Sequence, residues 1–232
     1  MKTRKDYIIK MSQMMFYKNG YEKTSIESIT KEVGIAKSTF YHHFKSKVEL
    51  LDAIIGKVFE DIETKLDDLL DDSNLNALKR MQSFFLIITT WKTENLDFLL
   101  SIIRDYFKDE NLVLRQKIAS SNFQRLSAYL KTILIEGAKE KIFKNRYERG
   151  LEEIILSIII FQNENLGQLI NSRQIVKIDS SVLVAKYQLI EKVVKQIIGL
   201  TTEEPVMFEE KTIKFWMDKI KEVLSEKTSN SS

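Results

Sequence analysis

The sequence contains no cysteine, a single proline, seven glycines and two histidines among its 232 residues. Without cysteine there are no disulfides, thiolate metal sites or cysteine nucleophiles, and two histidines are too few for a multi-histidine metal centre. Proline and glycine build turns and end helices, so their scarcity favours long helices joined by short connections. A β-sandwich or a doubly wound sheet would need many more turn residues. The composition therefore predicts an all-α fold.

Long hydrophobic runs are also missing. The N-terminal stretch MKTRKDYIIKMSQ is charged and lacks the apolar core of a signal peptide. The most apolar stretch, residues 154–161, is far too short to span a bilayer. We therefore expect a soluble, cytoplasmic protein with no membrane partner.

The net charge of +3 conceals an asymmetry along the chain. Residues 1–47 contain 10 Lys and Arg against 4 Asp and Glu, a charge of +6, whereas residues 48–232 contain 26 against 29, a charge of −3. A small basic segment on a mildly acidic body is typical of a domain that meets a polyanion. A solvated basic surface without a partner has the same composition.

Three helices are predicted in the basic segment. Apolar residues recur at helical spacing over residues 4–19, and Gly20 follows where a helix commonly ends. A second helix begins at Thr24, which matches a capping box with Glu27, and stops at Gly34. Only a tight turn separates it from a third helix over residues 37–44. Two short helices joined across such a turn predict a helix-turn-helix.

Helical spacing continues through the rest of the chain. Residues 48–72 form one long helix that leaves the head, and further helices are predicted at about 75–93, 95–107, 110–140, 147–172, 180–199 and 208–226. We therefore expect a head over residues 1–47, a helical body over 48–226 and a disordered polar tail over 227–232.

The third predicted helix has the side chains of a helix that reads DNA. In a helix-turn-helix the second helix lies in the major groove with its N-terminal residues aimed at base edges. Those residues are Lys37, Ser38 and Thr39, whose donors and acceptors suit base edges. Phe40 and Phe44 should face inward. The residues expected to face phosphates are Tyr41, His42, Lys45 and Lys47, with Thr24 and Ser25 at the start of the second helix.

The run GIAKSTFYHHFKSKVELL, residues 34–51, resembles the recognition motif of the TetR/AcrR family, approximately Gly-Val-Ser-x-Gly-Thr-Leu-Tyr-Tyr-His-Phe-Lys-x-Lys-x-x-Leu. The resemblance covers roughly residues 5–51. Four upstream residues also sit where the family keeps them: Phe16, Gly20, Thr24 and Ile29. Three positions depart from the pattern, since Thr30, Ser38 and His42 replace a common alanine, glycine and tyrosine.

The resemblance implies a homodimeric, DNA-binding transcriptional regulator that is not an enzyme and has no cofactor. It implies base contacts by Lys37, Ser38 and Thr39. It implies contacts to the DNA backbone by Thr24, Tyr41, His42 and Lys47. We expect a repressor that a small-molecule effector releases from a pseudo-palindromic operator in double-stranded DNA. An activator, or a regulator with a different kind of signal, fits the same residues.

The body supplies candidates for an effector pocket and a dimer interface. The pocket candidates share large aromatic rings, which fit core packing equally well: Phe84, Trp91, Phe98, Tyr106, Phe107, Phe123 and Phe161. Residues 151–170 are apolar nearly all round, with a polar insert at 162–165, which favours an interface between copies over a pocket wall. The interface candidates on this segment are Ile155, Ile158, Ile159, Gln162, Leu166 and Leu169.

Two other classes of function agree less well with the sequence. An enzyme would need a catalytic or cofactor-binding fingerprint, and the sequence has no nucleophile elbow, phosphate-binding glycine loop or metal-ligand cluster. His42 and His43 are adjacent on a helix and so point about 100° apart, which disfavours a shared metal. A helical protein-interaction module with a generic basic head would bind without regard to DNA sequence.

Overall fold

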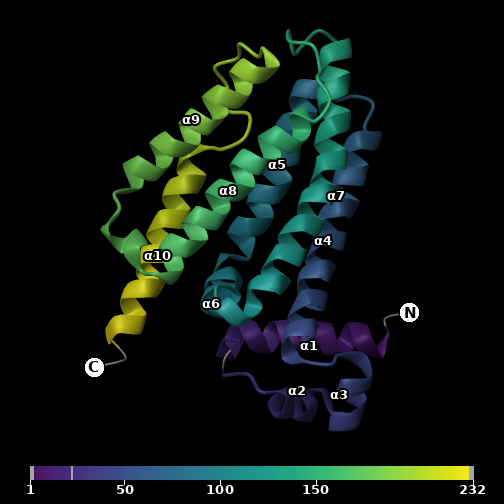
Figure 1. The fold of residues 1–232 in the computed structure, drawn as a ribbon, viewed down its shortest axis with the longest axis vertical. Coiled ribbons are helices and arrows are strands. Elements are labelled where there is room, and N and C mark those ends of the chain that lie inside the picture. Colours follow the sequence, from purple (N-terminus) through teal and green to yellow (C-terminus); the bar gives the residue numbers. More distant parts are fainter. Residues whose placement is uncertain (1–2, 22, 230–232) are drawn as a thin grey trace. The chain divides into compact units, whose positions relative to one another are not determined.

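The computed structural model describes residues 3–21 and 23–229, and within them every regular element is helical (Figure 1). The helices are α1 (Arg4–Asn19), α2 (Ile26–Val33), α3 (Lys37–His43), α4 (Lys47–Asp71), α5 (Ala77–Glu94), α6 (Leu96–Tyr106), α7 (Leu112–Lys139), α8 (Leu151–Asn171), α9 (Ser180–Ile198) and α10 (Glu210–Ser229), with short 3-10 turns η1 (Asp109–Asn111) and η2 (Gln174–Lys177). The all-α prediction is confirmed. In the described part of the chain, no helix is both long and apolar enough to cross a membrane.

The helix bounds agree with those predicted to within a few residues. The largest difference is at the start of α8, which begins at Leu151 and not at residue 147. At the C-terminus α10 continues to Ser229, through the first half of the predicted disordered tail. The remaining tail residues, 230–232, lie outside the described residues. Amphipathic spacing identifies helices well, because a helix of this length must bury one face.

The described residues form two compact units. The first contains the residues up to Asp61 together with Asn95–Ile118, and the second contains Ile62–Glu94 and the residues from Ala119 onward. The first unit is larger than the head predicted over residues 1–47, because α6 shares its core. Phe98 and Ile102 of α6 are buried in the same cluster as the apolar residues of the head.

The core of the first unit joins α1, α2, α3 and the first turns of α4. Ile8 and Phe16 of α1, Ile29 of α2, Phe40 of α3 and Leu50 of α4 are all fully buried there. Helices α2 and α3 are too short to be stable alone, so this shared core supplies the packing that holds them.

The start of α2 differs from the sequence prediction. Ser25, not Thr24, is the N-cap, and its hydroxyl oxygen accepts a hydrogen bond from the Ser28 backbone N–H at 3.0 Å. Thr24 is buried instead, and its hydroxyl donates to the Gly20 carbonyl at 2.7 Å. The capping-box prediction for Thr24 was therefore wrong, because its hydroxyl satisfies the end of α1 rather than the start of α2.

A buried ion pair joins α5 to α7 in the second unit. The Arg80 guanidinium pairs with the Glu136 carboxylate and also donates to the Asp72 carbonyl at 2.9 Å. The carboxylate of Glu140 accepts from the Ala77 backbone N–H at 2.9 Å, so the residue that follows α7 caps the first turn of α5. Arg80 is the buried charge here, and Glu136 and the Asp72 carbonyl offset the cost of burying its guanidinium.

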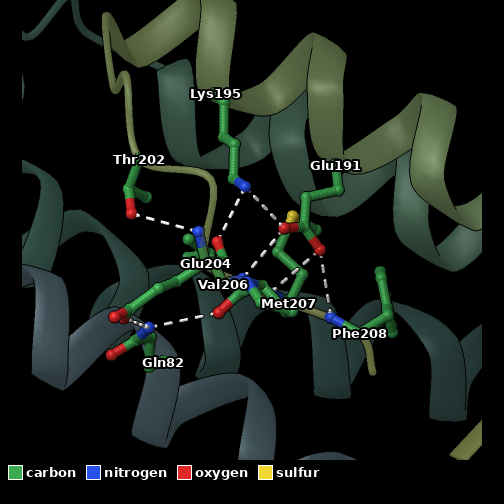
Figure 2. Close-up of polar contacts among 9 residues, drawn as sticks. Gln82, Glu191, Lys195, Thr202, Glu204, Val206, Met207 and Phe208 are labelled. Atoms are coloured by element: carbon green, nitrogen blue, oxygen red, sulfur yellow. Dashed lines mark hydrogen bonds and ion pairs between the residues drawn. The ribbon is translucent and has the colours of Figure 1, made fainter. Parts of the chain in front are cut away.

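The connection between α9 and α10 is fastened by a second buried carboxylate (Figure 2). Glu191 of α9 is 8% exposed. It accepts hydrogen bonds from the backbone N–H groups of Val206 at 2.9 Å, Met207 at 3.4 Å and Phe208 at 3.3 Å. Lys195, one turn later in α9, pairs with the same carboxylate at 2.9 Å. One side chain therefore satisfies three consecutive donors of the connection.

The same connection also reaches α5. The Gln82 side-chain amide donates to the Pro205 carbonyl at 3.1 Å, and Lys195 donates to the Glu204 carbonyl at 2.8 Å (Figure 2). Further along, the Trp216 indole N–H of α10 donates to the Thr93 hydroxyl of α5 at 2.8 Å. These contacts tie α10 and the connection before it to the helices of the second unit.

Candidate nucleic-acid interface

Helix α3 and its C-cap, Phe44, have one side buried in the core and the other exposed to solvent. Phe40 and Phe44 are buried, with their ring centroids 5.7 Å apart. Tyr41 and His42, which lie between them in sequence, are exposed. The inward direction predicted for the two phenylalanines is confirmed, and it fixes which face of α3 is open to a ligand.

The first turn of α3 is open. Its N-cap is Ala36, which provides no side-chain hydrogen bond. Lys37 and Ser38 are exposed and Thr39 is half-buried. A helix start with uncapped backbone N–H groups and exposed donors can approach an anion or a base edge.

Lys37 is paired with Glu27, which the sequence analysis had placed only in a capping box with Thr24. Its ammonium nitrogen lies 3.0 Å from Oε1 of Glu27 in the first turn of α2. The hydrogen bond to Glu27, followed by the charge of that carboxylate, raises the pKa of Lys37 above its ordinary value. Ten positions separate the two residues in the sequence, so no local pattern predicts the pair; it depends on how α2 and α3 pack.

Two of the predicted backbone-contacting residues point into the protein. The Lys47 ammonium donates to the carbonyls of Tyr21 at 2.9 Å and Thr24 at 3.2 Å, and it lies 4.1 Å from the centre of the Tyr21 ring. Thr24 is itself buried. Both residues therefore hold the connection between α1 and α2. The predicted contact residues that are exposed are Ser25, Lys37, Ser38, Tyr41, His42 and Lys45.

The aromatic residues predicted to line a pocket are divided between the two units, and the pocket stays a prediction. Phe98 is in the core of the first unit. Tyr106 and Phe107 belong to the same unit but are half-buried, and they form an edge-to-face pair. In the second unit Phe84 is buried against Phe85, with ring centroids 5.0 Å apart. The other predicted pocket residues also lie in the second unit, where Trp91 and Phe123 are half-buried and Phe161 is exposed.

Most of the predicted interface residues of α8 are covered by their own chain. Ile155, Ile159, Gln162 and Leu166 are buried, and Ile158 and Leu169 are half-buried. The exposed apolar side chains of α8 are instead Ile154 and Phe161, at 57% and 68%. Val182 and Leu189 of α9 are also exposed, at 60% each. The apolar side chains that α8 exposes are therefore not the ones predicted at an interface, and the interface itself stays a prediction.

A lysine lies on the inward face of α5, and the sequence analysis did not identify it. Lys92 follows Met81 and Phe85 at helical spacing; both of these are buried, and Lys92 is half-buried. Burial lowers the pKa of Lys92 to about 8, and no carboxylate of the described residues counters that shift. The sequence feature that could have identified Lys92 is a charged residue on a helix face that is otherwise apolar.

We expect Lys92→Met to raise the free energy of unfolding at pH 7 by about 1–3 kcal/mol. The pKa of Lys92 is about 8 in the folded chain and near 10.4 when unfolded. The unfolded chain binds more protons between these values, so wild-type stability rises with pH in that window. Urea unfolding of both proteins between pH 7 and 10 should show the gap narrowing as pH rises. Lys92→Arg, which stays charged, is the control; a pH-independent gap for Lys92→Met would contradict the expectation.

Residues 8–54, which span α1 to the first turns of α4, match the family model of bacterial regulatory proteins, tetR family. The nucleoid occlusion factor SlmA of Shewanella sp. (strain W3-18-1) is 24% identical over 172 residues, which cover 73% of this chain and 84% of that protein.

Two solved structures share the fold. The transcriptional regulator FadR from Bacillus subtilis, in complex with stearoyl-CoA, is 23% identical with a TM-score of 0.55, covering 84% of this chain and 98% of that chain. A transcriptional regulator from Cytophaga hutchinsonii ATCC 33406 is 18% identical with a TM-score of 0.55, covering 94% of this chain and 93% of that chain. At these identities the likeness establishes the arrangement of helices.

Proposed function

Because this chain is, by its N-terminal domain, a DNA-binding transcriptional regulator of the TetR family, we propose that it represses transcription as a homodimer on a pseudo-palindromic operator. A small molecule bound in the second unit releases it. The observation that carries the DNA-binding step is the orientation of α3. Phe40 and Phe44 fix its inner side in the core, so Lys37, Ser38 and Tyr41 are presented outward.

The proposed contacts follow from exposure. Lys37, Ser38 and Thr39 at the start of α3 read base edges in the major groove. The residues proposed to contact phosphates are Ser25, Tyr41, His42 and Lys45. Thr24 and Lys47 act indirectly, by holding the connection that sets α2 against α1.

Exposed apolar residues on α8 and α9 support the homodimer. Ile154 and Phe161 of α8, with Val182 and Leu189 of α9, are large apolar side chains in water. Large apolar side chains gathered on one surface mark interaction sites, and we propose that these four act together in this way. We propose that α8 and α9 pack on the same helices of a second copy through a two-fold axis. Two copies of α3 then read the two halves of a palindrome.

The proposed effector is an apolar molecule with an acidic group. Lys92, on the inward face of α5, is a cation that no described carboxylate neutralises, and an anionic ligand group would compensate it. The fold is shared with Bacillus subtilis FadR, whose structure contains stearoyl-CoA. The first part of α4 belongs to the first unit and its last turns to the second, so this helix is the proposed carrier of the signal. Release requires only that the effector favour one conformation.

Fluorescence anisotropy on DNA from upstream of the protein's own gene tests the proposal, with scrambled DNA for comparison. We expect selective binding that weakens with salt. Lys37→Ala and Tyr41→Ala should each reduce operator affinity by about tenfold or more, since a base or close phosphate contact is worth about 1–3 kcal/mol. Lys131→Ala, at an exposed lysine of α7, is the matched control and should bind as wild type. Equal binding to both DNAs, unaffected by the α3 variants, would contradict the proposal.

A further inference from the structure

The pair formed by Glu27 and Lys37 lies at the start of both helices of the helix-turn-helix. Glu27 is in the first turn of α2 and Lys37 is the first residue of α3. Resting on the DNA-binding function proposed above, we propose that Glu27 is a specificity-determining residue that reads one G·C base pair together with Lys37. It also weakens binding to DNA that lacks the operator.

Both side chains are available to DNA. The side chains of Lys37 and Glu27 are 54% and 77% exposed although they are paired. Exposed pairs contribute little to stability, typically about 0–1 kcal/mol. The pair therefore contributes little to the stability of the fold, and its main effect is on the groups that this part of the surface presents to a ligand. A DNA duplex docked on the first turn of α3 meets a cation and a carboxylate side by side.

That arrangement matches the edge of a G·C pair in the major groove. Guanine presents acceptors at O6 and N7, and cytosine presents its N4 amino donor beside O6. O6 and N4 are joined by a Watson–Crick hydrogen bond of about 2.9 Å. Lys37 Nζ and Glu27 Oε1 are 3.0 Å apart, which is a donor and an acceptor at the same spacing. Lys37 donates to guanine while Glu27 accepts from the cytosine amino group.

The same carboxylate disfavours DNA without that base pair. A phosphate repels Glu27, and where no cytosine amino group is in reach nothing offsets this repulsion. The pair with Glu27 also removes one net positive charge from the binding surface. Fewer counterions are then released from non-operator DNA, so its affinity and its salt dependence are both lower.

The test compares Glu27→Ala and Glu27→Gln with wild type on the operator, on scrambled DNA, and on operators with each base pair substituted symmetrically. For scrambled DNA at low salt we expect Glu27→Ala to bind about threefold to tenfold more tightly, with a salt slope steeper by about 1. For the operator series, the variant should lose about tenfold discrimination at one G·C position per half-site. Its urea unfolding midpoint should equal that of wild type. Glu32→Gln, an exposed acid later in α2, is the matched control.

Each outcome separates this inference from the function on which it rests. Wild-type protein that does not prefer its operator contradicts the DNA-binding proposal itself. If wild type prefers its operator but Glu27→Ala gains the same affinity for every DNA, the base-reading role of Glu27 is overturned. Glu27 would then only repel DNA in general. Discrimination lost at an A·T position instead of a G·C position also overturns the assignment of the base pair.

Discussion

Glu191→Ala is expected to lower the free energy of unfolding by about 3–5 kcal/mol, the usual result of breaking a buried ion pair. The variant leaves the backbone N–H groups of Val206, Met207 and Phe208 without their acceptor and Lys195 without its counter-ion. Unsatisfied buried donors cost about 1–3 kcal/mol each, so the connection between α9 and α10 should detach from α9. Urea unfolding followed by circular dichroism measures the loss, and native-state hydrogen exchange at residues 206–208 locates it.

A matched pair on α10 separates burial from charge. Glu210 and Lys214 have the same spacing as Glu191 and Lys195, but both are about half exposed. Glu210→Ala should change stability by less than about 0.5 kcal/mol. Glu191→Gln keeps the shape and one acceptor oxygen, so it should fall between wild type and Glu191→Ala. Similar losses for Glu191→Ala and Glu210→Ala would show that the buried carboxylate does not hold the connection.

Phe161→Glu is expected to convert a dimer into monomers and to weaken operator binding by about 100-fold or more. Large exposed aromatics near the centre of an interface dominate its energy, with losses of about 2–4 kcal/mol or more when removed. Across a two-fold axis the substitution acts twice and places carboxylates near one another. Sedimentation equilibrium gives the association state, and anisotropy on the operator gives the consequence for DNA.

The control for Phe161→Glu is Phe215→Glu. Phe215 is an exposed aromatic residue on α10, outside the proposed α8 and α9 surface. It should leave both the association state and DNA binding unchanged. If Phe215→Glu dissociates the protein and Phe161→Glu does not, the dimer uses α10 and the proposed surface is incorrect.

Local features of the sequence were sufficient to predict the helices and the family of the protein. The near absence of proline and glycine left few places for a helix to end, and apolar residues at helical spacing marked the faces to be buried. The helix-turn-helix was readable for the same reason, because Gly34 adopts the left-handed conformation that ends α2 and the turn follows at once. Phe40 and Phe44 faced inward as their spacing required.

Which face of an apolar helix is covered was decided only by tertiary packing. Helix α8 is apolar nearly all round, so helical spacing alone does not distinguish the side that carries Ile155 and Ile159 from the side that carries Ile154 and Phe161. Packing within the second unit buries the first pair and leaves the second in solvent. Periodicity locates a stripe only when the opposite stripe is polar.

Polar contacts between residues far apart in the chain could not be predicted from the sequence either. Glu27 meets Lys37 through the packing of α2 on α3, and Lys47 turns inward to donate to the carbonyls of Tyr21 and Thr24. Backbone spacing along one helix determines neighbours three and four positions apart, and these partners are ten or more apart. The sequence by itself determined that a basic recognition helix exists; the tertiary structure decided which of its charges remain available to DNA, because only packing brings separate helices together.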